Sequence, residues 1–402
     1  MNVFEKFKLS KHTIEAIEKL GISEPTDIQS KSIPHILNGK DVIGESATGS
    51  GKTLAFGCGI VEKVIPGAGL QSLILTPTRE LAEQVKHSLR QLAYLKRLNV
   101  LPIYGGVAIG PQIRDLPRTD VVVATPGRLL DHLERRTISL SKVNILVLDE
   151  ADRMFDMGFI EDVEKIIKHC PAKKQTMLFS ATIPPRIKDL VRKHMIDPVQ
   201  ISVDNQVDPS KLKQVYYDVS KNLKLSLLTH LLDSEKSGLV LVFCNTRRTT
   251  DFVVKNLQAN KIDAISIHGG LSQNKRNRII NSFNRAKAHV LVCTNVAARG
   301  LHIDNVSHVY NYEIPKDPKD YVHRIGRTAR AGEAGKAINL LCEYDYDNFS
   351  RILGEYRNFS IKKIDKPYLK RIIAIRPQQG RNRFPSRPRP AFIRNRGKNR
   401  FN

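Results

Sequence analysis

Residues 144–152 have the sequence Asn144-Ile145-Leu146-Val147-Leu148-Asp149-Glu150-Ala151-Asp152, an unbroken apolar run of strand length that ends abruptly in acids. An apolar run without alternation is typical of a strand buried on both faces of a parallel sheet. Acids that follow such a strand lie at its carboxyl end, the edge at which open α/β sheets bind ligands. The stretch therefore predicts a parallel α/β sheet with a ligand site that contains Asp149 and Glu150.

An earlier stretch specifies the ligand. Ser46-Ala47-Thr48-Gly49-Ser50-Gly51-Lys52-Thr53 follows an apolar run and resembles a phosphate-binding loop that opens a helix, although Ser46 stands where the general pattern has glycine. Its glycines let backbone amides approach phosphate oxygens, Lys52 suits the β- and γ-phosphates, and the Thr53 hydroxyl suits Mg²⁺. Asp149 would hold Mg²⁺ through its waters, while Glu150 would orient or deprotonate an attacking water. The two stretches together predict a site for a nucleoside triphosphate and magnesium.

The bulk composition limits the class of protein. A chain of 402 residues with 41% hydrophobic and 26% charged residues is long enough for two globular domains with full cores. We expect neither a membrane span nor a secretory leader, because no apolar run has the required length. The five cysteines are far apart, and reduced thiols in a cytoplasmic protein are the expected state.

Net charge indicates a polyanionic partner. The formal charge is +25, and residues 361–402 hold 14 Lys or Arg and one acid, so 13 of the 25 charges lie in this last segment. From Arg376 onward the segment is rich in Arg, Asn and Pro and lacks acids, a composition that is typical of disorder. Phenylalanines interleave with the basic residues there. We interpret residues 366–402 as a disordered RNA-binding tail, with a merely solubilising terminus as the alternative.

Strand candidates alternate with helical patterns in both halves of the chain, which favours two mostly parallel sheets covered by helices. The predicted domains are 1–203 and 212–365, joined by a polar linker at 204–211. The apolar run at 238–243 resembles the strand before the phosphate loop, but no second phosphate loop follows it. We therefore expect one nucleotide site shared by two similar domains. The predicted strands are 41–44, 72–76, 100–104, 121–124, 145–148, 176–179, 199–203, 214–219, 238–244, 264–268, 289–294, 308–311 and 336–342.

Several further motifs, in order, resemble the DEAD-box family of RNA-dependent ATPases, a family of ATP-dependent RNA helicases in helicase superfamily 2. The resemblance covers residues 4 to about 345, and it begins with the acids Asp149-Glu150-Ala151-Asp152 and the phosphate loop. The other matching motifs are Gly21 to Gln29 with Phe4 upstream, Pro77-Thr78-Arg79-Glu80-Leu81-Ala82, Gly105-Gly106, Thr125-Pro126-Gly127-Arg128, Ser180-Ala181-Thr182, Val242 to Thr246, Gln273-x-x-Arg276, Thr294 to Gly300 and His323 to Arg330.

The resemblance implies two tandem RecA-like domains that close on ATP, Mg²⁺ and RNA. Phe4 and Gln29 would bind adenine, by ring stacking and by a carboxamide that both donates and accepts. Arg327 and Arg330 would reach the phosphates as arginine fingers, and Asp152, Ser180, Thr182 and His323 would couple the ATP site to the RNA site. The implied RNA contacts are mostly to the backbone, with little sequence preference, and come from Thr78, Arg79, Gly105, Gly106, Thr125, Arg128, Thr246, Gly269 and Thr294.

The chain departs from the family pattern at two acidic positions. The usual acid after Thr294 is Asn295, and the usual acid two residues after Gly300 is His302. In the family the second acid faces the ribose, so His302 is interpreted as a change in nucleotide affinity. Ala329, where glycine is common, is a smaller departure.

The predicted function is RNA-stimulated ATP hydrolysis by a monomer, coupled to local, non-processive duplex unwinding or remodelling of RNA–protein complexes. Two alternatives stay open at this stage. One is an ATP-gated RNA scaffold or strand annealer, and the other is a DNA-directed motor.

Overall fold

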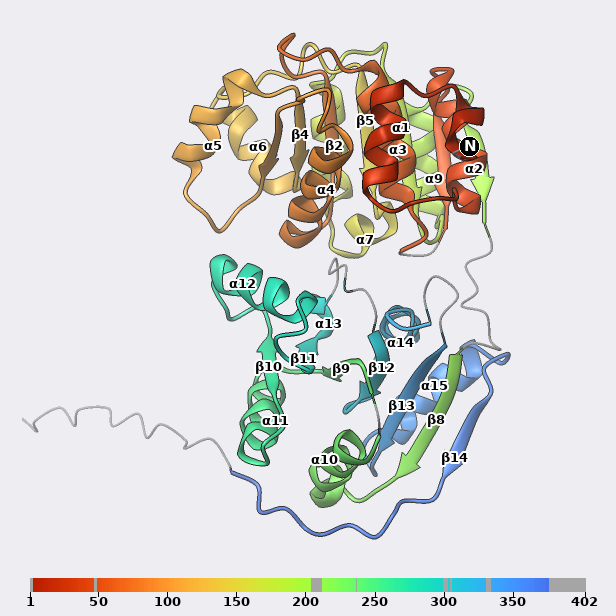
Figure 1. The fold of residues 1–402 in the computed structure, drawn as a ribbon, viewed down its shortest axis with the longest axis vertical. Coiled ribbons are helices and arrows are strands. Elements are labelled where there is room, and N and C mark those ends of the chain that lie inside the picture. The colour runs from red at the N-terminus through yellow and green to blue at the C-terminus, as the bar shows by residue number, and fades with distance from the viewer. Residues whose placement is uncertain are drawn as a thin grey trace, which may run out of the picture.

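A computed structural model describes residues 3–46, 49–203, 212–235, 237–298, 303, 306–329 and 334–375. These residues form two α/β domains that lie one above the other in Figure 1. The predicted linker at 204–211 lies outside the described residues. In the described part of the chain, no helix has both the length and the apolar character that crossing a membrane requires.

The first domain contains a seven-stranded sheet in which all paired strands are parallel, in the order β3-β4-β2-β5-β6-β1-β7. Its strands are β1 (Val42–Glu45), β2 (Ser72–Leu75), β3 (Val100–Ile103), β4 (Val121–Ala124), β5 (Ile145–Asp149), β6 (Gln175–Ser180) and β7 (Val199–Ser202). Its helices are η1 (Val3–Phe7), α1 (Lys11–Lys19), α2 (Asp27–Leu37), α3 (Lys52–Lys63), α4 (Arg79–Leu92), α5 (Ile109–Asp115), η2 (Leu116–Arg118), α6 (Pro126–Glu134), α7 (Ala151–Asp156), α8 (Ile160–Lys168) and α9 (Pro185–His194).

The second domain has a parallel seven-stranded sheet in the order β10-β11-β9-β12-β13-β8-β14. Its strands are β8 (Leu212–Asp218), β9 (Leu239–Cys244), β10 (Ala264–Ile267), β11 (Val290–Thr294), β12 (Val306–Asn311), β13 (Gly335–Leu341) and β14 (Ile361–Ile364). Its helices are η3 (Lys221–Leu223), α10 (Lys224–Ser234), α11 (Arg247–Ala259), α12 (Gln273–Asn284), α13 (Asn295–Ala298), α14 (Pro318–Ile325) and α15 (Tyr346–Glu355).

The two sheets have the same topology, since adding seven to each strand number of the first gives the order of the second. This agrees with the prediction of two related domains. It also corrects one correspondence: the counterpart of β1, which precedes the phosphate loop, is β8 rather than the run at 238–243. That run forms β9, the counterpart of β2. The apolar character of a central strand is shared by both positions, so composition alone did not distinguish them.

Helices cover both faces of each sheet. In the first domain α1 to α4 pack on one face and α6 to α9 on the other, and each interface forms its own hydrophobic core. Leu146, Val147 and Leu148 of β5 are buried between the two layers, and each contributes roughly 1.5–3 kcal/mol by leaving water. This burial fixes the strand that carries Asp149 at the carboxyl edge of the sheet.

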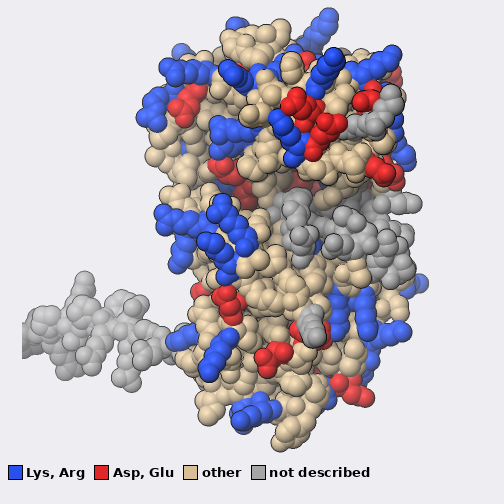
Figure 2. Space-filling view, in the orientation of Figure 1, with Lys and Arg blue, Asp and Glu red and all other residues tan. Residues whose placement is uncertain are grey.

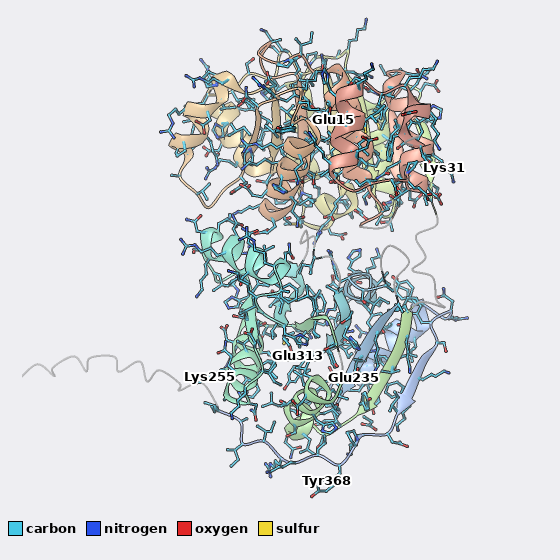
Figure 3. The ribbon with its side chains drawn as sticks, in the orientation of Figure 1. Glu15, Lys31, Glu235, Lys255, Glu313 and Tyr368 are labelled. Atoms are coloured by element: carbon cyan, nitrogen blue, oxygen red, sulfur yellow. The ribbon has the colours of Figure 1, made fainter. Side chains whose placement is uncertain are left out.

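The end of the second domain differs from the sequence prediction. β14 was not predicted, because a four-residue run with two lysines has no strand pattern, yet it pairs in parallel with β8. The predicted disordered tail began at residue 366, but residues 366–375 cross the domain as an ordered strap. Leu369 packs on its core, and the backbone of Ile375 exchanges two hydrogen bonds with the Asn256 amide. Figure 3 shows Tyr368 of this strap projecting at the edge of the domain that lies away from the first domain. Residues 376–402 lie outside the described residues.

Candidate functional site

The predicted phosphate loop connects β1 to α3. Gly49 and Gly51 have φ values of 88° and 93°, left-handed conformations that residues with a Cβ rarely adopt. Lys52 begins α3, and its Nζ donates a 2.9 Å hydrogen bond to the backbone oxygen of Ser46. The hydroxyls of Ser46 and Ser50 lie 2.8 Å apart. The loop therefore closes on its own lysine at the N-terminus of a helix, the arrangement that binds anions in other proteins.

A cavity of about 710 Å³ begins at this loop and runs along α4 to α12 of the second domain. Residues from both domains line it. The predicted nucleotide residues in its lining are Gln29, Gly49, Gly51, Lys52, Thr53, Asp149 and Glu150. The second domain contributes Asn277, Ile280, Asn281 and Asn284 of α12.

Gln29 braces the phosphate loop from the start of α2. Its Nε2 donates to the backbone oxygen of Gly51 at 3.0 Å, and its Oε1 accepts from the backbone N–H of Thr26 at 3.0 Å. The Thr26 hydroxyl donates to the backbone oxygen of Ser50 at 2.7 Å. Each atom of the carboxamide has one hydrogen-bonding position left for adenine. The sequence prediction missed this bracing role.

Phe4, which was predicted to stack on adenine, lies in the core of the first domain. Its side chain is fully buried in the first core, where its ring meets Phe7 edge-on at 5.8 Å between centroids. An apolar ring gains from this burial, and stacking of Phe4 on adenine stays a prediction. Leu20 and Ile22 line the cavity instead, close in sequence to Gln29. These apolar side chains, of which Ile22 belongs to the motif Gly21 to Gln29, form a surface of the cavity that the sequence analysis did not assign.

Asp149 and Glu150 lie at the carboxyl end of β5, as predicted. The Asp149 carboxylate accepts from the backbone N–H of Glu150 at 3.0 Å, and Glu150 forms a buried ion pair with Arg153. Glu150 has a φ of 52°, a left-handed conformation that is rare for a residue with a side chain. Strain of this kind is concentrated at functional sites, where the surrounding structure enforces it.

Electrostatics distinguishes the two acids. Burial raises the pKa of Asp149 to about 7, against the opposing charge of Lys52. Burial also acts to raise the pKa of Glu150, but the cations Arg153, Lys52 and Arg327 outweigh it and hold that pKa below its usual value. Arg327 belongs to the second domain and is 5% exposed. The field at Glu150 is therefore built by both domains.

The predicted coupling residues of the first domain form one hydrogen-bonded cluster. The Asp152 carboxylate accepts from the backbone N–H groups of Ala181 and Thr182 at 3.2 and 3.1 Å. The Ser180 hydroxyl accepts from the backbone of Asp152 at 3.0 Å and donates to the backbone oxygen of Thr182 at 2.7 Å. His323 lies on α14 of the second domain. The cluster ties the end of β6 to the helix that follows Glu150.

Predicted RNA-contact threonines occupy equivalent places in the two domains. Thr78 caps α4 and Thr246 caps α11, and each hydroxyl accepts from a backbone N–H three residues on. Thr125 is the N-cap position of α6, and Thr294 ends β11. All four therefore lie at the carboxyl ends of strands, at the same edge of their sheets.

Two glycine turns lie beside arginines in the same way. A Cβ on Gly106, which has a φ of +78°, would overlap the Arg79 guanidinium, and Arg128 lies 3.9 Å from the Cβ position of Gly105. In the second domain Arg247 lies 3.2 Å from the Cβ position of Gly269. Arg247 was not among the predicted residues, although it follows a capping threonine as Arg79 does. A backbone without a side chain, beside a guanidinium group, is a suitable binding place for a phosphate group.

Gly106→Ala should weaken the use of RNA without changing ATP binding. The added Cβ must displace Arg79 and strains a positive φ, so we expect the RNA concentration for half-maximal ATPase stimulation to rise about tenfold, as loss of a charge-assisted hydrogen bond implies. The matched control is Gly110→Ala, since a Cβ there meets nothing within 4 Å. Equal behaviour of the two variants in an RNA titration would contradict the assignment.

A hydrogen-bonded contact joins the two domains. Gln273 Nε2 donates to Glu80 Oε1 at 2.7 Å, and Arg276 forms a 3.2 Å ion pair with the same oxygen. Glu80 is 4% exposed, and burial lowers the pKa of Arg276 against the charge of Glu80. Figure 2 shows Lys and Arg gathered over α12 on this side of the junction. The motif Gln273-x-x-Arg276 was noted in the sequence, but its partner Glu80 was not predicted.

Six residues named individually in the sequence analysis lie outside the described residues. They are Ala47, Thr48, Gly300, His302, Arg330 and Arg376.

Comparison with known proteins agrees with this two-domain arrangement over most of the chain. Residues 26–190 match the family model "DEAD/DEAH box helicase", and residues 223–332 match "Helicase conserved C-terminal domain". The chain is 46% identical over 344 residues to the DEAD-box ATP-dependent RNA helicase CshA of Geobacillus kaustophilus, covering 85% of this chain and 74% of the relative.

Two solved structures are similar over the whole fold. A DEAD box protein from the hyperthermophile Methanococcus jannaschii is 41% identical with a TM-score of 0.56, covering 90% of this chain and 98% of that one. Dbp5 of S. cerevisiae bound to RNA and ADP BeF3 is 29% identical with a TM-score of 0.82, covering 91% and 96%. With two RecA-like domains, the ordered motifs and these relatives, the chain belongs to the DEAD-box family of ATP-dependent RNA helicases.

Proposed function

We propose that the cavity between the domains is the ATPase site and that the glycine turns and capping threonines beside it hold RNA. The observation that carries the proposal is the cavity itself, which Lys52, Asp149 and Glu150 of the first domain line together with α12 of the second. Arg327 of the second domain also acts with Lys52 to lower the pKa of Glu150. A carboxylate surrounded by cations from both domains fits a water-activating group whose site is complete only when the domains meet.

Nucleotide binding is assigned to the phosphate loop and its brace. Lys52 would leave the Ser46 oxygen for the phosphates, and the remaining hydrogen-bonding positions of Gln29 would face adenine beside Ile22. Asp149 and the Thr53 hydroxyl are hard oxygen donors and fit Mg²⁺, which neutralises phosphate charge when it is bound with the nucleotide. Asp149 would be ionised in that state.

Hydrolysis is assigned to Glu150 and the arginines. Glu150 would orient the attacking water and accept its proton, with its carboxylate released from Arg153 or shared with it. Arg327, and Arg330 by the family resemblance, would stabilise charge on the γ-phosphoryl group during transfer.

RNA contacts are assigned mainly to backbone phosphates. Arg79 and Arg128 supply charge beside the first glycine turn, and Arg247 does so beside the second. Such contacts hold the strand and carry little sequence information, while discrimination against DNA would come from 2′-hydroxyl groups. A strand gripped by both domains would be bent on closure, which disrupts a duplex locally and non-processively.

The ATP site and the RNA site would be coupled through the contacts that lie between them. The Asp152 cluster links the ATP-site helix α7 to β6, and the Glu80 contact with Gln273 and Arg276 holds α4 against α12. His323 of α14 would join the Asp152 cluster on closure. Monomeric state, cytoplasmic location and RNA binding by the tail at 366–402 stay predictions from the sequence.

The deciding experiment compares ATP hydrolysis with matched RNA and DNA oligonucleotides. Strong stimulation by RNA alone supports the proposal, whereas equal stimulation would favour a DNA-directed motor. Unwinding and annealing rates with and without ATP, for the full chain and for a chain cut after Arg376, separate a helicase from an annealer. Annealing without ATP-dependent unwinding would contradict the proposal.

A further inference from the structure

Arg324 of α14 is a buried junction of the second domain, with 1% of its surface exposed. Its Nε donates to Asn295 Oδ1 at 2.6 Å, and its Nη2 donates to Asn245 Oδ1 at 2.8 Å. Its Nη1 donates to Asn311 Oδ1 at 3.0 Å and to the backbone oxygen of Glu313, labelled in Figure 3, at 2.6 Å. One side chain therefore joins α14 to the carboxyl ends of β9, β11 and β12.

All of these acceptors are neutral oxygens. A buried cation requires compensation by charge, because removal from water disfavours the charged form. Burial lowers the pKa of Arg324 to about 10, and the largest charge acting in the opposite direction is that of Asp320. The face of the Phe243 ring, with its centroid 5.1 Å from the guanidinium carbon, adds a weaker attraction.

Asn295 connects this charge to the guanidinium. Its Nδ2 donates to Asp320 Oδ2 at 2.8 Å while its Oδ1 accepts from Arg324. A carboxamide can donate and accept at once, whereas an ionised carboxylate only accepts. The sequence departs from the family pattern at this position, since the usual acid after Thr294 is absent. The negative charge that acts on the guanidinium comes from Asp320, four residues before Arg324 on the same helix.

The junction lies between the two parts of the proposed site. Asn245 and Asn295 adjoin Thr246 and Thr294, to which RNA contacts are assigned. On the other side, the backbone N–H of Arg327 donates to the backbone oxygen of Arg324 at 3.1 Å. Movement of Arg324 would therefore move the segment that carries the arginine finger relative to the RNA-contacting strand ends.

We propose that Asp320 and Asn295 act together as positioning residues for Arg327. Asp320 supplies the negative charge, and Asn295 connects that charge to Arg324 by hydrogen bonds. Arg324 then keeps Arg327 in the position that hydrolysis requires when RNA is bound. The inference rests on the role proposed above for Arg327.

Asn295→Asp restores the family residue but should impair this chain. It places two carboxylates within hydrogen-bond distance and removes the only donor that Asn295 offers to Asp320. Asp320→Asn removes the compensating charge. The double variant Asn295→Asp with Asp320→Asn exchanges the two roles. The carboxylate is then at position 295, where it accepts from the guanidinium, and the amide at position 320 donates to that carboxylate.

The test measures RNA-stimulated kcat, KM for ATP and thermal unfolding for the wild type, both single variants and the double variant. Each single change should lower kcat about tenfold, as expected for a hydrogen bond to a charged group, with little change in KM for ATP. The double variant should return to within about threefold of wild type by the same measure. Asp347→Asn, at an exposed position of α15, is the matched control and should leave kcat unchanged.

Two results would overturn the inference. One is a double variant as slow as the single variants, and the other is an Asp320→Asn variant with wild-type kcat. The unfolding midpoints of the same four proteins compare the single and double variants without ATP or RNA. If the double variant loses as much stability as the two single variants together, this would also count against the connection between Asp320 and Arg324. A wild-type chain that RNA fails to stimulate would contradict the proposed function instead, and the unfolding midpoints would still test that connection.

Discussion

Replacing Glu150 with glutamine should reduce RNA-stimulated ATP turnover by about 10²–10⁴-fold, the range of a lost general base. Glutamine keeps the size and one acceptor oxygen of the side chain but cannot take the proton of the attacking water. The phosphate loop, Gln29 and the RNA-contact residues are untouched, so ATP and RNA should still bind. The protein should accumulate as an ATP-dependent RNA clamp, measurable as slow RNA release.

The matched control is Glu161→Gln on the exposed face of α8. It makes the same chemical change and should keep full turnover. Glu150→Gln also removes the partner of a buried arginine, Arg153, so RNA retention with ATP serves as proof that the variant is folded. Turnover near the wild-type rate would refute the role of Glu150.

Arg327→Ala should lower kcat by about 10³-fold, the lower end of the range for arginine fingers. The side chain is buried in the second domain, and its charge acts on Glu150 across the domain junction. Its loss removes cationic stabilisation of the transferring phosphoryl group while the ATP-binding face of the first domain stays intact. We therefore expect a change in kcat that greatly exceeds any change in nucleotide affinity, measured by ATPase kinetics and by binding of a fluorescent nucleotide.

Arg278→Ala provides the comparison, because it removes one positive charge from an exposed position of α12. Arg327→Lys tests geometry, since lysine keeps the charge and loses the planar fork that binds two oxygens. If Arg327→Ala behaves like Arg278→Ala, the catalytic arginine lies elsewhere, and Arg330→Ala becomes the next variant to measure.

Local patterns predicted every described strand except β14 and the positions of most site residues in the sheets. The apolar run before Asp149 is typical of a buried strand, and the glycine spacing before Lys52 is typical of a tight loop at a helix start. Ligand positions at the carboxyl edge follow from the topology of parallel sheets. Each of these properties depends on residues that are close in sequence, which is why the sequence reveals them.

Side-chain partners were less predictable. Phe4 was assigned to adenine, and its ring is buried against Phe7. Gln29 was also assigned to adenine, but two of its four hydrogen-bonding positions are occupied by Thr26 and Gly51. The order of residues 366–375 depends on Leu369 and on the distant amide of Asn256. These outcomes depend on which groups compete for burial and hydrogen bonds in the folded chain.

By itself, the sequence determined the α/β class, the nucleotide loop, the acidic strand end and the family of this protein, because periodicity and motif spacing encode local geometry. Only the tertiary structure decided how Glu80 meets Gln273 and Arg276 and how Asn295 joins Asp320 to Arg324. These contacts join residues from different elements, and their free energy depends on burial and charge that exist only after the helices and strands have packed.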